Sequence, residues 1–200
     1  KTINPMNIVL VDYGAGNIQS LKFALDRLNV DAVLSSNKNE ILAADKVIFP
    51  GVGEASSAMQ KLESSGLDLL IPELTQPVLG ICLGMQLMCS HTEEGDTLGL
   101  GIFDVAVKRF KSDVKVPQIG WNTITNMKYP LFHNIKNNEY MYSVNSYYAA
   151  LCKETAAQTQ YGLNYSCALQ KNNFYGVQFH PEKSSKAGSQ LLLNFINLNL

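Results

Sequence analysis

The sequence predicts an α/β fold with a mostly parallel central sheet flanked by helices, to which the second half of the chain adds antiparallel strands. Strand-length apolar runs alternate with helical apolar patterns through the first 90 or so residues. Extended segments separated by Asn-rich turns then follow, and a last helical pattern comes near the C-terminus. Alternation of strand and helix favours a parallel sheet covered on both faces, whereas short extended segments joined by turns favour antiparallel pairing.

The first half supplies the expected parallel strands and their helices. Four apolar runs have strand length, at residues 7–11, 31–34, 46–49 and 78–81. Three segments carry apolar residues at helical spacing, at residues 17–28, 54–62 and 83–89. A buried parallel strand reads as a continuous apolar run, which is what these four segments show.

The second half is expected to contribute the antiparallel strands and the last helix. The extended segments are residues 100–107, 121–125, 141–148, 167–170 and 175–179, and the last helix is predicted over residues 189–198. We see no repeat and no linker, so residues 6–200 are predicted to form a single domain. Residues 1–5 precede Met6, which we interpret as the biological start, and they are expected to be an added remnant or a disordered extension.

Composition narrows the function classes. The 200 residues are 46% hydrophobic and 16% charged, with a formal net charge of -1. Without a basic stripe, nucleic-acid binding has little support, and the apolar runs are too short to span a membrane. No secretory signal is evident, so we expect a cytoplasmic protein with reduced cysteines. No cofactor is expected, and no metal site, since the four cysteines show neither C-x-x-C spacing nor a nearby histidine at ligand spacing.

The segment Gly80-Ile81-Cys82-Leu83-Gly84 has the form of a nucleophile elbow, with cysteine in place of serine. Such an elbow is a tight strand-to-helix turn, and Gly80 and Gly84 remove Cβ atoms that would clash around it. The thiol would then lie at a helix N-terminus, where the helix dipole and free N–H groups favour the thiolate and can stabilise an oxyanion. Taken alone, the short motif fits a simply buried cysteine equally well, so it needs a base.

His180 is the candidate base, because it directly follows an apolar strand in the segment Phe179-His180-Pro181-Glu182. In an extended segment, residues two apart point the same way, so Glu182 can lie beside the imidazole and fix its tautomer. Cys82, His180 and Glu182 are therefore predicted as nucleophile, base and orienting residue. The simpler alternative for His180 is a strand-end or surface histidine. We interpret His91, in a loop or at a helix end, and His133 as structural.

Two further Gly-containing turns follow apolar strands. Pro50-Gly51-Val52-Gly53 offers backbone N–H groups that could complete an oxyanion hole, although an ordinary strand-to-helix turn is the alternative. The turn at residues 12–17 lacks the third glycine of a dinucleotide fingerprint, since position 19 is Gln, so we reject a dinucleotide site there.

Taken together, these motifs resemble the class I glutamine amidotransferase family and its flavodoxin-like fold. Gly80 to Gln86 and His180-Pro181-Glu182 carry the general resemblance. A narrower likeness, to the glutaminase subunits of imidazole glycerol phosphate synthase in histidine biosynthesis, rests on further segments at residues 12–17, 50–53, 117–122 and 180–184.

The resemblance implies a reaction and a set of roles. Cys82 would attack the side-chain amide of L-glutamine to form a thioester, with His180 moving the protons and Glu182 orienting it. The oxyanion hole would comprise Gly51, Val52, Gly53 and Leu83, and the Gly51–Val52 peptide would turn its N–H inward only when a partner signals readiness. Substrate-binding positions would be Gly53, Leu83, Gln86, Glu94, Ser146 and Tyr147.

The implied partner is a TIM-barrel cyclase subunit, which would form a heterodimer with this chain and receive ammonia across the interface. The matching interface positions are Asn17, Trp121, Asn122, Tyr142 and Lys183, with Lys183 pairing a carboxylate of the partner. Core packing is the alternative for Trp121 and Tyr142.

The chain departs from the usual pattern of these subunits at three positions. Asn145 and Gln118 stand where histidine is common, and Ser143 where phenylalanine is common. These departures leave three alternatives beside the histidine-pathway subunit: a glutaminase paralogue serving another synthase such as a surface-sugar amidation enzyme, an unrelated cysteine hydrolase, and an inactive regulatory module. The three catalytic candidates are all present, which argues against the last.

Overall fold

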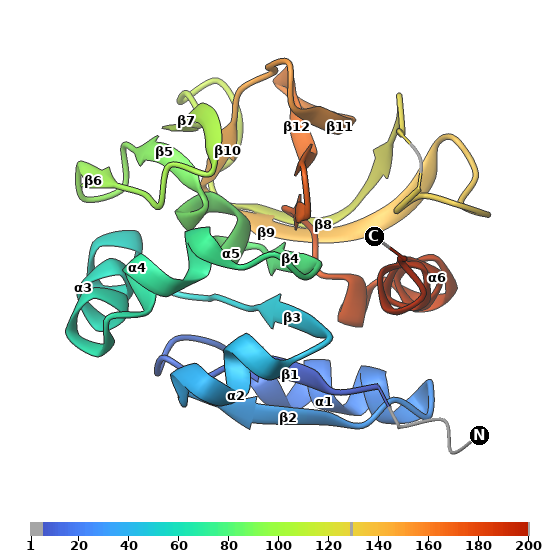
Figure 1. Cartoon of the computed structure of the whole chain (residues 1–200). Coiled ribbons are helices and arrows are strands. Elements are labelled where there is room, and N and C mark those ends of the chain that lie inside the picture. Colours follow the sequence, from blue (N-terminus) through green and yellow to red (C-terminus); the bar gives the residue numbers. More distant parts are fainter. Residues whose placement is uncertain (1–5, 129, 200) are drawn as a thin grey trace.

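The centre of the fold is a parallel sheet (Figure 1). The computed structural model describes residues 6–128 and 130–199, so the expectation for residues 1–5 lies outside the described part. Five strands pair in parallel in the order β2 (Ala32–Ser35), β1 (Ile8–Val11), β3 (Lys46–Phe49), β4 (Val78–Ile81) and β13 (Phe174–Val177). The C-terminal strand β13 thus lies directly beside β4, the strand that precedes Cys82.

Antiparallel strands extend this sheet beyond β13. They follow in the order β12 (Leu163–Lys171), β10 (Tyr147–Ala149), β7 (Phe103–Arg109), β5 (Cys89–Thr92) and β6 (Thr97–Leu98), with β11 (Thr155–Tyr161) also paired to β12 and with β5 and β7 parallel to each other. A separate antiparallel pair is formed by β8 (Gln118–Ile124) and β9 (Glu139–Asn145). The predicted fold class, a mostly parallel sheet with antiparallel additions from the second half, is confirmed.

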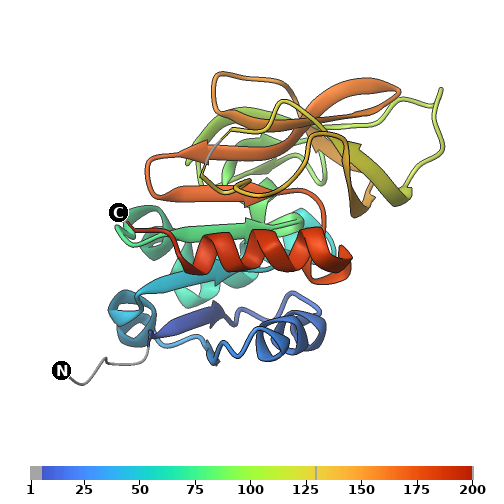
Figure 2. The same cartoon turned by 90° about the vertical axis from the view of Figure 1, so that its right-hand side faces the viewer.

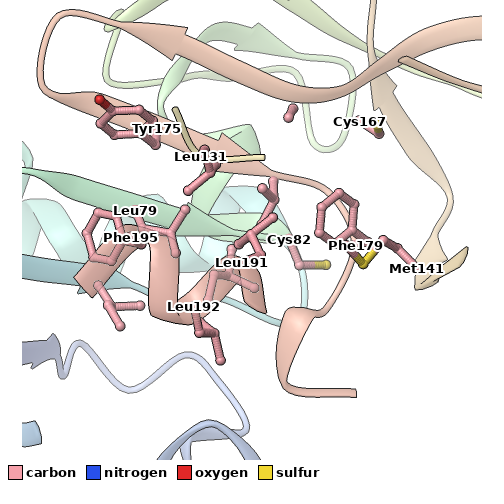
Figure 3. Packing of buried hydrophobic residues seen from close by; sticks show 14 of the residues in the cluster. Leu79, Cys82, Leu131, Met141, Cys167, Tyr175, Phe179, Leu191, Leu192 and Phe195 are labelled. Atoms are coloured by element: carbon pink, nitrogen blue, oxygen red, sulfur yellow. The ribbon is translucent and has the colours of Figure 1, made fainter. Parts of the chain in front are cut away.

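Helices cover both faces of the parallel strands. One hydrophobic core includes α1 (Ile18–Arg27) and α6 (Ser185–Ile196), and the opposite core includes α2 (Lys38–Ala43), α3 (Ala55–Ser65), α4 (Leu67–Leu70) and α5 (Leu83–Leu87). A 3-10 turn, η1 (Ile71–Glu73), follows α4. Figure 2 shows α6 lying across its face of the sheet. In Figure 3 Leu191 and Leu192 of α6 lie among the core residues near Leu79, and Cys82 lies between these residues and Phe179.

Local sequence signals set the ends of several helices. The Glu54 carboxylate accepts the backbone N–H groups of Ser56 and Ser57 at the start of α3, and Gly66 ends that helix with a φ of 67°. These are a side-chain N-cap and a left-handed C-terminal glycine. The helix predicted over 54–62 therefore exists and extends further.

Several predicted boundaries are wrong, such as that of the last helix, predicted over 189–198 and found at Ser185–Ile196. Two elements differ more. The helix predicted over 83–89 ends at Leu87, and Cys89 instead begins β5, opposite Phe103 of β7. The extended segment predicted over 141–148 divides at Ser146 into β9 and β10, which belong to different sheets. In both places pairing with distant strands overrides the local apolar pattern.

Within the described residues, no helix combines the length and apolar content needed to cross a membrane.

Candidate active site

Cys82 occupies a strained turn between β4 and α5. Its φ of 54° and ψ of -114° lie outside the regions that most non-glycine residues adopt. A Cβ at Gly84 would sit 2.0 Å from the Phe49 carbonyl oxygen, and one at Gly80 would sit 2.4 Å from the Met88 sulfur. The two glycines therefore permit the close approach of α5 to β3 and β4 that the elbow requires, as the sequence predicts.

Pairing of β4 with β13 brings the cysteine and the histidine segment together. The two strands are parallel, with Ile81 opposite Val177, and the Cys82 N–H donates to the Val177 carbonyl at 2.8 Å. Because the carboxyl ends of parallel neighbours meet at one sheet edge, residues 178–182 emerge beside the elbow. The distance of nearly one hundred residues in sequence is thus removed by a single strand pairing.

Cys82, His180 and Glu182 form a connected, buried row. His180 Nδ1 and Glu182 Oε1 are 2.7 Å apart, and each of these two side chains is 7% exposed. Nδ1 is engaged by Glu182, and a hydrogen bond with Cys82 also raises the pKa of the imidazole. The orientation predicted for Glu182 is found, although Glu182 lies in a 3-10 turn, η2 (Pro181–Lys183), rather than in an extended segment.

This row holds a proton on the imidazole. Burial lowers the pKa of His180, but the hydrogen bonds and negative charges of Cys82 and Glu182 outweigh it and raise the pKa to about 10. These interactions favour a proton on the imidazole, beside Cys82.

A pocket of about 360 Å³ opens over the Cys82 sulfur. Most of the residues predicted for substrate binding and the oxyanion hole line this pocket. The complete lining is Val52, Gly53, Cys82, Leu83, Gln86, Glu94, Pro117, Val144, Asn145, Ser146, Tyr147, His180 and Lys183. Gln86 is buried, and its Nε2 donates to the Tyr147 carbonyl and to Gln178 Oε1. Burial raises the pKa of the half-buried Glu94 carboxyl, which accepts the Ala55 N–H.

The predicted oxyanion turn faces the elbow with a carbonyl instead of an N–H. The Leu83 N–H, a predicted oxyanion donor, donates to the Gly51 carbonyl oxygen at 3.2 Å. The Tyr13 hydroxyl donates to the carbonyl of Pro50, the residue before Gly51, at 2.8 Å. Gly53, at the other end of the turn, has a φ of 104°. In this conformation the Gly51 carbonyl occupies the Leu83 N–H, so this donor is not free to bind an oxyanion.

Sequence reasoning missed Gln178, which contacts the nucleophile directly. Its side chain is fully buried and donates from Nε2 to the Cys82 sulfur at 3.6 Å. In an extended segment, residues two apart point the same way, and Gln178 lies two residues before His180. This spacing is the local signal that could have indicated Gln178. Tyr13 was missed as well, because nothing local shows that it supports a turn 37 residues away.

The predicted interface residues lie outside the core to different degrees. Trp121 is 52% exposed and packs edge-on against Tyr142, its cross-strand neighbour, with ring centroids 5.8 Å apart. Core packing is therefore wrong for Trp121. Asn17 and Lys183 are exposed, whereas Asn122 is half-buried and donates to the Gln160 carbonyl.

The other histidines and cysteines do not line the pocket. His91 lies in β5, not in a loop or at a helix end as predicted, and contacts Asp96 at 2.7 Å. All four cysteines are free, and burial raises the thiol pKa of Cys89 and Cys167 far above its usual value. These two thiols are inert core groups, in contrast to Cys82.

Comparisons with known proteins give the family. The model "Glutamine amidotransferase class-I" matches residues 9–198. The imidazole glycerol phosphate synthase subunit HisH of Bacteroides fragilis strain YCH46 is 54% identical, covering 96% of this chain and all of that protein, and the HisH of Haemophilus influenzae strain KW20 is 45% identical over 96% and 97%. Among solved structures, a glutamine amidotransferase shares the fold with a TM-score of 0.73 at 17% identity, covering 94% of this chain and 96% of that one. The chain therefore belongs to the class I glutamine amidotransferase family, among the imidazole glycerol phosphate synthase subunits HisH.

Proposed function

We propose that Cys82, His180 and Glu182 hydrolyse the side-chain amide of L-glutamine in this chain, which is the glutaminase subunit of imidazole glycerol phosphate synthase in histidine biosynthesis. The observation that carries the proposal is the buried row from the Cys82 sulfur through His180 to Glu182 at the ends of two adjacent parallel strands. Nucleophile, proton carrier and orienting carboxylate are the groups that acyl transfer through a thioester needs.

In the proposed reaction, the Cys82 thiolate attacks the carboxamide carbon and the carbonyl oxygen becomes an oxyanion. The C–N bond then breaks as His180 donates its proton to the nitrogen, releasing ammonia and leaving a glutamyl thioester. Neutral His180 next takes a proton from water, whose oxygen attacks the thioester, and glutamate leaves as the thiolate re-forms. The proton held by His180, with its pKa near 10, supports its role as the acid of the first half.

The closed oxyanion turn supports a resting state of the enzyme. We propose that rotation of the Gly51–Val52 peptide removes the carbonyl from Leu83 N–H and turns the Val52 N–H inward. Two donors would then face the oxyanion, a contribution worth about 3 kcal/mol per donor in related sites. Rotating this peptide changes ψ of Gly51 and φ of Val52, and Gly51, which has no Cβ, tolerates the change on its side.

Substrate recognition is proposed to divide between the two ends of the pocket. The Glu94 carboxylate is the acidic group for the α-ammonium of glutamine, and Gln86, with both N–H groups engaged, offers its carbonyl oxygen. Backbone groups of Gly53, Ser146 and Tyr147 line the same space.

The proposed partner is a TIM-barrel cyclase subunit that binds over the β8–β9 pair to form a cytoplasmic heterodimer, with ammonia crossing a channel at the interface. Exposed Trp121 and Asn17 and the pocket-lining Lys183 support this location. A paralogue serving another synthase has less support, because relatives 45–54% identical over their whole length are named as HisH.

Cys82→Ala tests the assignment. We expect ammonia release from glutamine to fall to background, because the attacking sulfur is gone, while cyclase binding and the folded structure persist. The measurement is coupled glutamate detection with and without the cyclase, with Cys89→Ala as the matched cysteine control. Near-normal ammonia release from Cys82→Ala would refute the proposal.

A further inference from the structure

Asn145 carries an unsatisfied acceptor at the wall of the Cys82 pocket. The side chain is 6% exposed and lines the pocket. Its Nδ2 donates to the Tyr147 carbonyl at 2.9 Å, but its Oδ1 is buried without a hydrogen-bond partner among residues 6–128 and 130–199. A buried acceptor left unpaired costs free energy, so a bound molecule that donates to it would recover that cost.

The surrounding contacts prevent the Asn145 amide from turning over. The Tyr147 carbonyl can only accept, so it requires the Nδ2 side of the amide. The Tyr165 hydroxyl donates its own proton to Gln118 Oε1 at 2.8 Å, so toward Asn145 it can only accept. Gln118 is also the direct cross-strand neighbour of Asn145.

The pKa of the Tyr165 hydroxyl also depends on its contact with Asn145. Burial raises the pKa of its hydroxyl strongly, and a hydrogen bond from Asn145 acts in the opposite direction. Both acceptors therefore favour the Nδ2 side of the amide, and the residues that set this orientation come from four strands, β8, β9, β10 and β12.

Asn145 is next in sequence to a residue that contacts the Cys82 sulfur, where the reacting end of the substrate must lie. The preceding residue, Val144, offers its carbonyl to the Cys82 thiol at 3.8 Å. Glu94, the acidic group suited to the α-ammonium, belongs to the segment after β5 and contacts the start of α3. Asn145 thus follows the residue whose carbonyl contacts the sulfur and lines the same pocket, and the amide nitrogen of a bound glutamine must also lie near that sulfur.

We propose that Asn145 Oδ1 accepts a hydrogen bond from the carboxamide N–H of glutamine and keeps it as that nitrogen leaves. This inference rests on the proposed function. As the C–N bond breaks and His180 supplies the third proton, the departing ammonia still has an N–H to donate to Oδ1. Asn145 would act as a specificity residue for a nitrogen leaving group, since an ester oxygen carries no such proton.

The test compares two substrates in the complex with the cyclase subunit. Asn145→Ala and the milder Asn145→Ser are assayed with L-glutamine and with the γ-methyl ester of L-glutamate, and Asn164→Ala, an exposed strand asparagine, is the matched control. We expect kcat/KM for glutamine to fall about tenfold, as one lost hydrogen bond predicts, while the value for the ester stays within about threefold.

Equal losses on amide and ester would overturn the inference, because they would mean that Asn145 only supports the fold or binds the α-ammonium that both substrates share. Selective loss on glutamine in either variant supports it. A wild-type complex that releases no ammonia would overturn the proposed function together with this inference, whereas equal losses in an active complex would leave the proposed function standing.

Discussion

The His180 imidazole is set between two groups that both favour its charged form. Glu182 accepts from Nδ1, Cys82 acts on the same ring, and together they outweigh the burial that lowers the pKa of His180. A residue with this environment is held in one tautomer and one orientation. The local consequence is that proton delivery and ring position depend on the same carboxylate.

Replacement of Glu182 by Gln should lower the pKa of His180 from its value of about 10, because a neutral amide stabilises the imidazolium less. Histidine-selective NMR titration measures this directly, and His91 and His133 serve as internal controls. The raised pKa also implies that protonated His180 stabilises the fold. That contribution is complete below a pH of about 6.5, the unfolded value, and is lost as the pH rises through about 10. A wild-type His180 that titrates near 6.5 would contradict this account.

At the scale of elements, α6 holds the turn that carries Glu182. A Cβ at Gly188 would lie 1.9 Å from the Pro181 carbonyl oxygen, so the helix contacts η2 through bare backbone. Ser184 strengthens this junction, since its hydroxyl donates to the His180 carbonyl and accepts the Tyr142 N–H. Strand β13, η2, α6 and β9 are therefore coupled at His180.

Gly188→Ala should push α6 away from η2 and displace His180 and Glu182. We expect a fall in kcat of at least about tenfold and a loss of about 1–3 kcal/mol in the free energy of unfolding, the usual cost of overpacking. Steady-state kinetics and urea unfolding measure the two effects. Lys186→Ala, an exposed change on the same helix, is the control and should leave both values unchanged.

What the sequence could predict at this scale depended on whether a signal was local. The elbow glycines and the His-Pro-Glu order lie within a few residues of the chemistry they serve, so Cys82, His180 and Glu182 were predictable. The end of α5 was not, because Cys-Ser-His-Thr has little apolar pattern and becomes β5 only by pairing with β7. Gln178 was hidden for a different reason: its role depends on Gln86 and Cys82, which reach it from other elements.

Among the described residues, three exposed apolar side chains gather on the β8–β9 pair. Ile119, Trp121 and Tyr140 are each more than half exposed, and Pro117 at the start of β8 lines the Cys82 pocket. Apolar surface beside an active-site mouth is typical of a docking face. Alternation of strands and helices predicted the parallel sheet, but not that β13 would insert beside β4, since chain order alone does not specify which strands become neighbours.

Trp121→Ala should weaken binding of the cyclase subunit while leaving the stability of the isolated chain nearly unchanged, because the side chain is half exposed. Loss of a central interface tryptophan typically costs about 2 kcal/mol or more, a rise of roughly thirtyfold in Kd. Calorimetric titration measures the affinity, and thermal unfolding of the free chain checks the fold. Leu98→Ala, on the exposed edge strand β6, is the control. Unchanged affinity in Trp121→Ala would remove this residue from the interface.

The orientation of the Gly51–Val52 peptide has a consequence for the nitrogen supply of the cell. While its carbonyl is bonded to the Leu83 N–H, a bound glutamine would keep its nitrogen, whatever the state of the sulfur. Free ammonia is readily lost, and glutamine is costly to remake, so an enzyme that cleaves only on demand avoids a futile drain on both. Because Gly51 has no Cβ, we expect the rotation of this single amide to suffice, so that no domain has to move.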